Sequence, residues 1–271
     1  MTVSELSVLM RSQLVPHFGA DEARSLERAI FEDLMNLSLV DVAMSPDRQL
    51  PDFMPGKVQN VIERLLKGEP LQYITGTARF CGMTFHVTPA VLIPRPETEQ
   101  LVDMIVDGWE SKADLRVLDL GTGSGCIAIA LARALKFAHV TAADISTAAL
   151  EVAKRNADDL HARVKFVQAD ILNLKLPGEW DIIVSNPPYV LEKERASMEP
   201  NVLEHEPAGA LFVPDDDPMK FYDAILSYSR SHLAPGGAIY FEINPLCADR
   251  YKGAKIIRDY RGVNRFATYE T

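Results

Sequence analysis

Three glycines alternate with small polar residues in the stretch DLGTGSG, which runs from Asp119 to Gly125. The stretch lies between an apolar run typical of a buried strand and a helical pattern that starts at Cys126. Because glycine has no Cβ, a ligand can lie against the backbone of such a loop and face the N-terminus of the following helix. The loop therefore indicates a nucleotide-type site. Its five residues are Gly121, Thr122, Gly123, Ser124 and Gly125.

The spacing of these glycines disfavours a dinucleotide. In a dinucleotide fingerprint the third glycine comes three residues after the second, whereas Gly125 follows Gly123 by two. A nicotinamide-dependent dehydrogenase nevertheless stays open as an alternative. It would be recognised by stabilisation of the fold with NAD.

Acidic residues end the next two expected strands. Asp144 lies about 20 residues beyond the glycine loop, where a carboxylate can accept hydrogen bonds from both hydroxyls of a ribose. Asp170 and Ile171 end the third strand. An adenine could rest there between an apolar side chain and a polar edge, so we predict that Asp144 and Ile171 contact a nucleoside.

The apolar run 180–185 ends in Asn186, Pro187, Pro188 and Tyr189. Two successive prolines cannot extend a strand ladder, so the chain leaves the sheet in a stiff, extended form. The side-chain oxygen of Asn186 and the carbonyl of Pro187 can then accept both hydrogens of an incoming –NH2 group. Tyr189 offers a flat face to a planar group. This chemistry fits either an amide or the exocyclic amine of a nucleobase.

The elements that must position these residues form a repeated alternation of strand and helix beyond residue 98. Short apolar strands separated by amphipathic helices predict a mostly parallel sheet covered on both faces. The expected strands are 116–120, 139–145, 164–170, 181–186, 237–243, 254–260 and 265–270, and the expected helices are 125–135, 146–160 and 218–233.

The chain before this alternation has a different character. Residues 1–78 are predicted to form a small helical bundle, since the stretches 21–37 and 57–68 place apolar side chains at helical spacing. Residues 79–97 are predicted to form a β-hairpin linker, and residues 98–271 the nucleotide-binding domain.

Composition and charge exclude several classes of protein. Hydrophobic residues make up 47% and charged residues 24% of the 271 residues, which is ordinary globular usage, and no apolar run reaches the length of a membrane span. The net charge of −10 argues against binding to a long phosphate backbone. Three scattered cysteines favour a reducing cytoplasm and offer no metal-ligand spacing. Cys126 has apolar neighbours and is expected to be a packing residue, and His86, His161 and His205 receive no role.

The combined motifs resemble a known family. The glycine loop, the acid after the second strand and the NPPY sequence are similar to those of S-adenosylmethionine-dependent methyltransferases that alkylate planar nitrogen atoms. With "PLQYITG" (70–76), "IPRPETE" (93–99) and "EHEPAGALF" (204–212), essentially the whole chain resembles the bacterial protein-glutamine N5-methyltransferases of the HemK/PrmC family, which modify peptide chain release factors.

The resemblance implies a Rossmann-like class I methyltransferase domain with a seven-stranded, mostly parallel sheet, preceded by a helical domain that recognises the substrate. The implied cofactor is S-adenosyl-L-methionine, and its product is S-adenosyl-L-homocysteine. The glycine loop and Asp144, Ile171 and Asn186 would bind the cofactor. Asn186 to Tyr189 would hold the glutamine amide, with Asn186 and Pro187 as the catalytic acceptors. The roles of Arg95, Glu97 and Thr98 stay open.

The implied partners are peptide chain release factors, which would be modified in their Gly-Gly-Gln motif. Binding of nucleic acid, of a membrane or of a metal ion is not expected. A cytoplasmic monomer is expected. Two alternatives remain besides the dehydrogenase: an amino-methyltransferase acting on a nucleobase in RNA or DNA, and a binding module that keeps the pocket without turnover.

One stretch departs from the family pattern. Only about ten residues connect the strands 237–243 and 254–260, whereas a parallel crossover usually takes a dozen or more. Either the connecting helix is reduced to a turn, or residues are missing between Ile243 and Ala254. We favour missing residues, because a mere turn would leave one flank of the sheet poorly covered.

Overall fold

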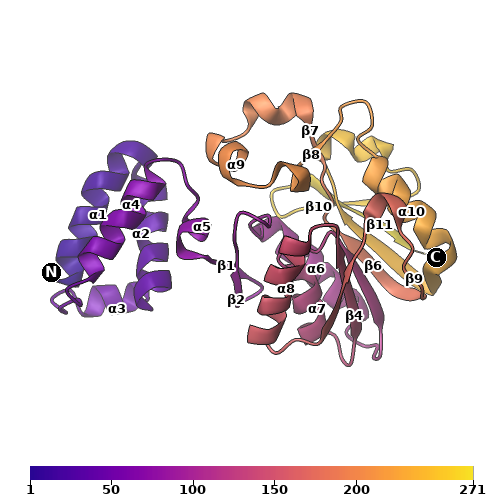
Figure 1. Ribbon diagram of the computed structural model, residues 1–271, viewed down its shortest axis with the longest axis horizontal. Helices are drawn as coiled ribbons and strands as arrows, with labels where there is room; N and C mark the ends of the chain where they lie inside the picture. The colour runs from indigo at the N-terminus through magenta and orange to yellow at the C-terminus, as the bar shows by residue number, and fades with distance from the viewer. Residues whose placement is uncertain (271) are drawn as a thin grey trace. The chain divides into compact units, whose positions relative to one another are not determined.

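The computed structural model describes residues 1–270, which divide into two compact units (Figure 1). The helical unit comprises Met1–Thr77 and Pro200–His205, and the sheet unit comprises Ala78–Glu199 and Glu206–Thr271. The sequence-based boundary at residue 78 lies next to this division. The hairpin region 79–97, expected as a linker, groups with the sheet unit, and the segment 200–205 groups with the helical unit.

The helical unit is held by apolar faces on short helices. A capping box of Thr2 and Glu5 begins the first helix, and Gly19 ends it with a φ of 79°. A cluster that includes Leu6, Ile30 and Ile62 forms its core. The helices are α1 (Val3–Phe18), α2 (Ala20–Met35), α3 (Leu39–Met44), α4 (Met54–Leu65), α5 (Leu71–Thr75) and α9 (Pro200–His205).

The sheet unit contains a seven-stranded sheet with the strand order β10-β11-β9-β6-β3-β4-β5. All neighbouring pairs are parallel except those of β11, which is antiparallel to both β9 and β10. The prediction of a seven-stranded, mostly parallel sheet is thus confirmed. The strands are β3 (Arg116–Leu120), β4 (His139–Asp144), β5 (Val164–Gln168), β6 (Trp180–Ser185), β9 (Leu233–Glu242), β10 (Lys255–Arg258) and β11 (Asn264–Glu270).

Helices cover both faces of this sheet (Figure 1). Successive residues of β3 point to opposite faces, so Val117 joins one buried cluster and Leu118 the other. The first cluster packs against α6 and α7, and the second packs against α10. The helices are α6 (Pro96–Trp109), α7 (Cys126–Ala134), α8 (Thr147–Asp159) and α10 (Lys220–His232), with short 3-10 helices η1 (Ile171–Asn173), η2 (Glu192–Ser197), η3 (Ala208–Ala210) and η4 (Pro245–Arg250).

Two small two-stranded sheets complete the unit. One is the predicted hairpin, β1 (Thr77–Phe80) with β2 (Met83–His86), and the other pairs β7 (Val190–Leu191) with β8 (Phe212–Val213). Phe80 and Phe85 from the hairpin are fully buried in the cluster under α6 and α7. The hairpin therefore packs as part of the sheet unit.

The connection from β9 to β10 contains η4 and no longer helix. In the structure this connection is thus a short 3-10 segment instead of the full helix of the family pattern, and the favoured alternative of missing residues between Ile243 and Ala254 stays a prediction. Cys247 and Tyr251 from this connection are buried, and the Tyr251 ring packs edge-on against Tyr222 with centroids 4.9 Å apart. Ile256 and Tyr269 are only half-buried on this flank, which agrees with the thin cover expected there.

Helix α6 is one of the elements that were not predicted from the sequence. Residues 79–97 were expected to form a β-hairpin linker, but Pro96 occupies the first helical turn of α6, where its missing N–H costs nothing. Its buried face then continues through Thr98, Leu101, Val102 and Ile105. No helix within residues 1–270 is long and apolar enough to cross a membrane.

Candidate active site

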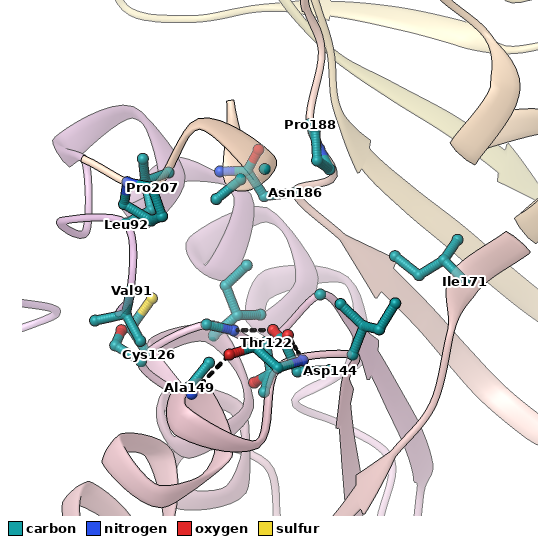
Figure 2. Close-up of a pocket in the computed structure, with 18 of the residues that line it drawn as sticks. Val91, Leu92, Thr122, Cys126, Asp144, Ala149, Ile171, Asn186, Pro188 and Pro207 are labelled. Atoms are coloured by element: carbon teal, nitrogen blue, oxygen red, sulfur yellow. Dashed lines mark hydrogen bonds between the residues drawn. The ribbon is translucent and has the colours of Figure 1, made fainter. Parts of the chain in front are cut away.

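The strand order reverses beside β3, and ligands of open α/β sheets bind at the carboxyl ends of strands at such a point. The glycine loop follows β3 and the NPPY sequence follows its neighbour β6. A cavity of about 440 Å³ opens between them, within the usual range for a cofactor pocket. Figure 2 shows Thr122 and Asp144 at its base, Asn186 and Pro188 above, and Ile171 to one side.

The glycine loop adopts a conformation that other residues would resist. Gly121, Gly123 and Gly125 have φ values of 75°, 53° and 81°, in the left-handed region that favours glycine. A Cβ on Gly123 would meet no protein atom within 4 Å, so this backbone faces open space. The N–H groups of Gly121 and Thr122 both donate to the carbonyl of Ala143, at 2.8 and 3.0 Å, which ties the loop to β4. Four of the five predicted loop residues line the cavity, namely Gly121, Thr122, Gly123 and Ser124, and Gly125 does not.

Asp144 lies at the end of β4 and is oriented by two backbone donors. Its Oδ2 accepts from the Gly123 N–H and its Oδ1 from the Ser146 N–H, both at 2.9 Å. Each carboxylate oxygen retains a further lone pair. The side chain lines the cavity and can therefore still accept two hydrogen bonds from a diol.

Ile171 and its neighbours supply an apolar side wall. Ile171 lines the cavity, and its Cδ1 lies 3.6 Å from the position of a Cβ on Gly121. Asp170 caps the turn η1 through a 2.9 Å bond from the Leu172 N–H, and Leu172 and Phe221 also line the cavity. Both the apolar surface and the polar edge expected for a nucleobase are present.

The NPPY residues divide into two pairs. Asn186 and Pro188 line the cavity, while Pro187 is buried and Tyr189 is not among the lining residues. The Tyr189 hydroxyl points away to the carboxylate of Glu242, at 2.9 Å. The structure therefore brings Asn186 to the cofactor cavity, and the predicted contact of the Tyr189 ring with substrate stays a prediction.

A chain of hydrogen bonds begins at Asn186 and runs into the protein. Its Nδ2 donates to the hydroxyl of Thr98 at 3.3 Å, and that hydroxyl donates to Glu242 at 2.7 Å. Thr98 lies on the first turn of α6, and Glu242 ends β9. Burial raises the pKa of Glu242, and the hydrogen bonds from Thr98 and Tyr189 and the charge of Arg265 act in the opposite direction.

A partly buried ion pair joins two walls of the cavity. Glu206 is almost fully buried and accepts from the Arg95 guanidinium at 2.5 Å and from the Ile93 N–H at 3.2 Å. Ile93 and Arg95 line one wall, and Pro207, directly after Glu206, lines another. This contact gives structural roles to the "IPRPETE" and "EHEPAGALF" sequences.

A third buried carboxylate lies beneath the glycine loop. Asp119 accepts a 2.6 Å hydrogen bond from the Thr122 hydroxyl, and its other oxygen has no hydrogen-bond partner among the described residues. Burial raises the pKa of Asp119 to about 7, although the hydrogen bond from Thr122 and the nearby backbone N–H of Ala128 lower it. Asp119 therefore supports the loop from below.

No histidine, lysine or glutamate is among the residues that line the cavity with Asn186. The titratable residues lining the cavity are Arg95, Cys126, Asp144 and Asp170. Burial raises the pKa of Cys126 to about 12, so the thiol is not a nucleophile at neutral pH. His86, which pairs with Asp159 at 3.0 Å, His161 and His205 do not line the cavity. No cluster of acidic, histidine or cysteine side chains within residues 1–270 could hold a metal ion.

Sequence reasoning missed Asp119, Glu242 and Glu206 as parts of the site and left Thr98 open. A signal was present for the first two, because each is a carboxylate inside an apolar strand. Buried carboxylates are rare unless something pairs with them. Their partners lie far away in sequence, and only the folded chain reveals them.

Comparison with known proteins agrees with this architecture. Residues 97–206 match the family model of the "Methyltransferase small domain", and residues 11–76 match that of the "PrmC N-terminal domain". A methyltransferase from Pyrococcus furiosus superposes with a TM-score of 0.51 at 19% identity, covering 78% of this chain and 98% of that one. The fold and site thus define a Rossmann-like class I methyltransferase, whose cofactor is S-adenosylmethionine.

Proteins that are similar to this chain in sequence identify a narrower family within this class. A release factor glutamine methyltransferase from Bacteroides thetaiotaomicron is 43% identical and covers 98% of this chain and 99% of its own. Another from Chlorobaculum tepidum is 35% identical over 90% of this chain and 89% of its own. This chain belongs to the release factor glutamine methyltransferase family.

Proposed function

We propose that this protein transfers a methyl group from S-adenosyl-L-methionine to the side-chain amide nitrogen (N5) of the glutamine in the Gly-Gly-Gln motif of peptide chain release factors. The names of its relatives support release factors as the substrate. The observation that carries the proposal for this chain is the Asn186 amide, which lines the cofactor cavity with its nitrogen bonded to Thr98. Its oxygen is left to accept from an –NH2 group.

The cavity fits the cofactor on its own geometry. The open backbone at Gly123 leaves room for the amino-acid portion, Asp144 can accept from both ribose hydroxyls, and Ile171 can pack on the adenine. When bound, S-adenosylmethionine supplies an electrophilic methyl group on a sulfonium. The product would be S-adenosyl-L-homocysteine.

The chain's own contribution to the reaction is alignment. An amide nitrogen is a weak nucleophile, because its lone pair is delocalised into the carbonyl. Proximity and orientation can contribute about 7 to 11 kcal/mol at best. Acceptors at Asn186 and at the Pro187 carbonyl would hold both N–H bonds and favour positive charge growing on nitrogen. The proton then leaves easily to solvent, so no general base is needed.

The finer features of the proposal follow from the substrate. The helical unit, residues 1–77 with 200–205, would recognise the release factor, while the sheet unit carries out the chemistry. We infer that the protein acts as a monomer in the cytoplasm, where translation takes place. The net charge of −10 supports a protein substrate over direct binding of nucleic acid.

The test is a methyl-transfer assay with labelled S-adenosylmethionine. The protein is incubated with a release factor, with the same factor after replacement of the Gly-Gly-Gln glutamine by alanine, and with ribosomal or transfer RNA. We expect label on the unchanged factor alone, at the glutamine side chain by mass spectrometry. Equal label on the alanine variant would refute the substrate, and label on RNA would favour a nucleobase amino-methyltransferase.

A further inference from the structure

We propose that Thr98 and Glu242 are positioning residues that lock the Asn186 amide with its oxygen towards the substrate, and that this lock makes the site select a primary amide over a carboxylate. The inference rests on the proposed function and deepens it, because it assigns the choice of glutamine over glutamate to residues that do not touch the transferred methyl group.

Three elements converge on the lock. Asn186 follows β6, Glu242 ends the neighbouring strand β9, and Thr98 lies on the buried face of α6. Thr98 is 2% exposed and Glu242 is 1% exposed, so water does not compete for their hydrogen bonds. Asn186 Nδ2 donates to Thr98 at 3.3 Å, Thr98 donates to Glu242 Oε2 at 2.7 Å, and the Tyr189 hydroxyl donates to Glu242 Oε1 at 2.9 Å.

The direction of these bonds follows from the chemistry of the groups. The two oxygens of the Glu242 side chain accept hydrogen bonds from the hydroxyls of Thr98 and Tyr189. Thr98 has one hydroxyl hydrogen, and it is engaged in the hydrogen bond to Glu242. The Thr98 oxygen can therefore only accept from Asn186, so the atom of Asn186 that faces it must be the –NH2 nitrogen. This sequence of hydrogen bonds, which ends at Glu242, fixes the orientation of the Asn186 side-chain amide. Without such partners the amide could rotate and exchange the positions of its oxygen and nitrogen.

The surroundings of Glu242 act on its pKa in both directions, and burial, the largest influence, raises it. The positive charge of Arg265 on β11 favours the carboxylate, whereas Glu97 on α6 and burial oppose it. The Glu242 backbone is held as well, because its carbonyl accepts from the buried Tyr222 hydroxyl at 2.9 Å. The carboxylate is thus fixed in position at the end of the relay.

Selectivity follows from the orientation of Asn186. A glutamine side chain offers two hydrogens, to the Asn186 oxygen and the Pro187 carbonyl. A glutamate would bring a carboxylate oxygen against these same two acceptors and leave all of them without a hydrogen. Sites built to hydrogen-bond a donor reject an analogue that lacks it, because their polar groups are left unpaired. If the Asn186 amide could rotate, its –NH2 group would instead accommodate a carboxylate.

The experiment compares Thr98→Val, which keeps the shape but has no hydroxyl, with Thr98→Ser, which keeps the hydroxyl. Thr141→Val is the matched control, because Thr141 is a buried threonine on β4 that does not line the cofactor cavity. For each we would measure kcat, the Kd of S-adenosylmethionine, and the inhibition constant of a release factor carrying glutamate in place of the target glutamine.

We expect Thr98→Val to lower kcat about tenfold or more, the loss that corresponds to one net hydrogen bond, with the cofactor Kd unchanged within about twofold. The preference for glutamine over glutamate should also become smaller: the inhibition constant of the glutamate-carrying release factor should fall by a similar factor. Thr98→Ser should recover most of both losses, and Thr141→Val should change neither. In an Asn186→Ala background, Thr98→Val should have little further effect, since coupled residues are not additive.

An unchanged kcat and an unchanged glutamate inhibition constant in Thr98→Val would overturn the inference while leaving the proposed function intact. A parallel loss of cofactor affinity, or full additivity with Asn186→Ala, would also overturn it, because both indicate general disruption. If the wild-type protein methylates no glutamine, the proposed function fails. The lock is then judged by NMR: the Asn186 side-chain N–H protons must exchange slowly in the wild type and in Thr98→Ser, and faster in Thr98→Val.

Discussion

At the residue scale, Asn186 is the side chain on which turnover should depend most. Asn186→Ala removes the acceptor for the substrate amide but leaves the glycine loop and Asp144 in place. We expect kcat to fall about 100-fold or more, the usual loss for one preorganised hydrogen-bonding group. Calorimetry should find nearly unchanged affinity for S-adenosylmethionine. A normal kcat in this variant would contradict the role given to Asn186.

Asp144 should govern cofactor affinity. Both of its oxygens are oriented by backbone N–H groups at 2.9 Å towards the cavity, and hydrogen bonds to a charged group are stronger than neutral ones. Asp144→Ala should raise the Kd of S-adenosylmethionine about 10- to 100-fold. Glu151→Ala, at an exposed position on α8, is the control. Equal affinities in calorimetry would remove Asp144 from the site.

At the element scale, the turn from β3 into α7 depends on Gly125. Its φ is 81°, and an added Cβ would lie 3.1 Å from both the Cβ of Ala153 and the Cδ1 of Ile129. Gly125→Ala should lower the free energy of unfolding by about 2 to 4 kcal/mol, from backbone strain and overpacking together. Gly262→Ala, with a φ of 79° and nothing within 4 Å, should cost about 1 to 2 kcal/mol. Equal losses in denaturant titrations would contradict the packing argument.

Most helices and strands of the sheet unit could be predicted from the sequence, but some could not. The strands and the helices α7, α8 and α10 were predicted to within a few residues, because short apolar runs between amphipathic helices have few other solutions. The glycine loop and NPPY were recognisable because their chemistry is local. Helix α6 was missed, since Pro96 was assigned to the hairpin linker 79–97 and not to the start of a helix.

Long-range pairs lay beyond local patterns. Thr98 and Glu242 are 144 residues apart in sequence, and Ile93 and Glu206 are 113 apart. No periodicity links such positions. Their contact depends on which strand ends meet at the carboxyl edge of the sheet, so only the three-dimensional strand order reveals it.

At the scale of the whole molecule, one buried carboxylate should shape the dependence of stability on pH. Burial raises the pKa of Asp119 from its ordinary value of 3.8 to about 7 in the folded protein. Between about pH 4 and pH 7 the folded state therefore holds a proton that the unfolded state has lost. Stability falls as pH rises through this window, by at most about 1.4 kcal/mol per pH unit from this group, and this contribution levels off above pH 7.

Asp119→Asn should remove this part of the slope, because asparagine does not titrate. Denaturant titrations at pH 5 and pH 8 would measure it, with the variant gaining on the wild type at pH 8. Asp181→Asn is the control: the hydrogen bond from Arg116 lowers the pKa of Asp181, so its contribution changes only at more acidic pH. Identical pH slopes for the wild type and Asp119→Asn would contradict the prediction.

The one-way order of hydrogen bonds from Asn186 through Thr98 to Glu242 has a consequence for inhibitor design. The edge of a ligand that faces the Asn186 oxygen must present hydrogen-bond donors, so carboxylates and ketones should be poor choices there. Primary amides, ureas and amidines each present an –NH2 edge. Joined to a nucleoside that occupies the cofactor cavity, such a group would span both halves of the site, and its affinity should depend on Thr98 as well as on Asn186.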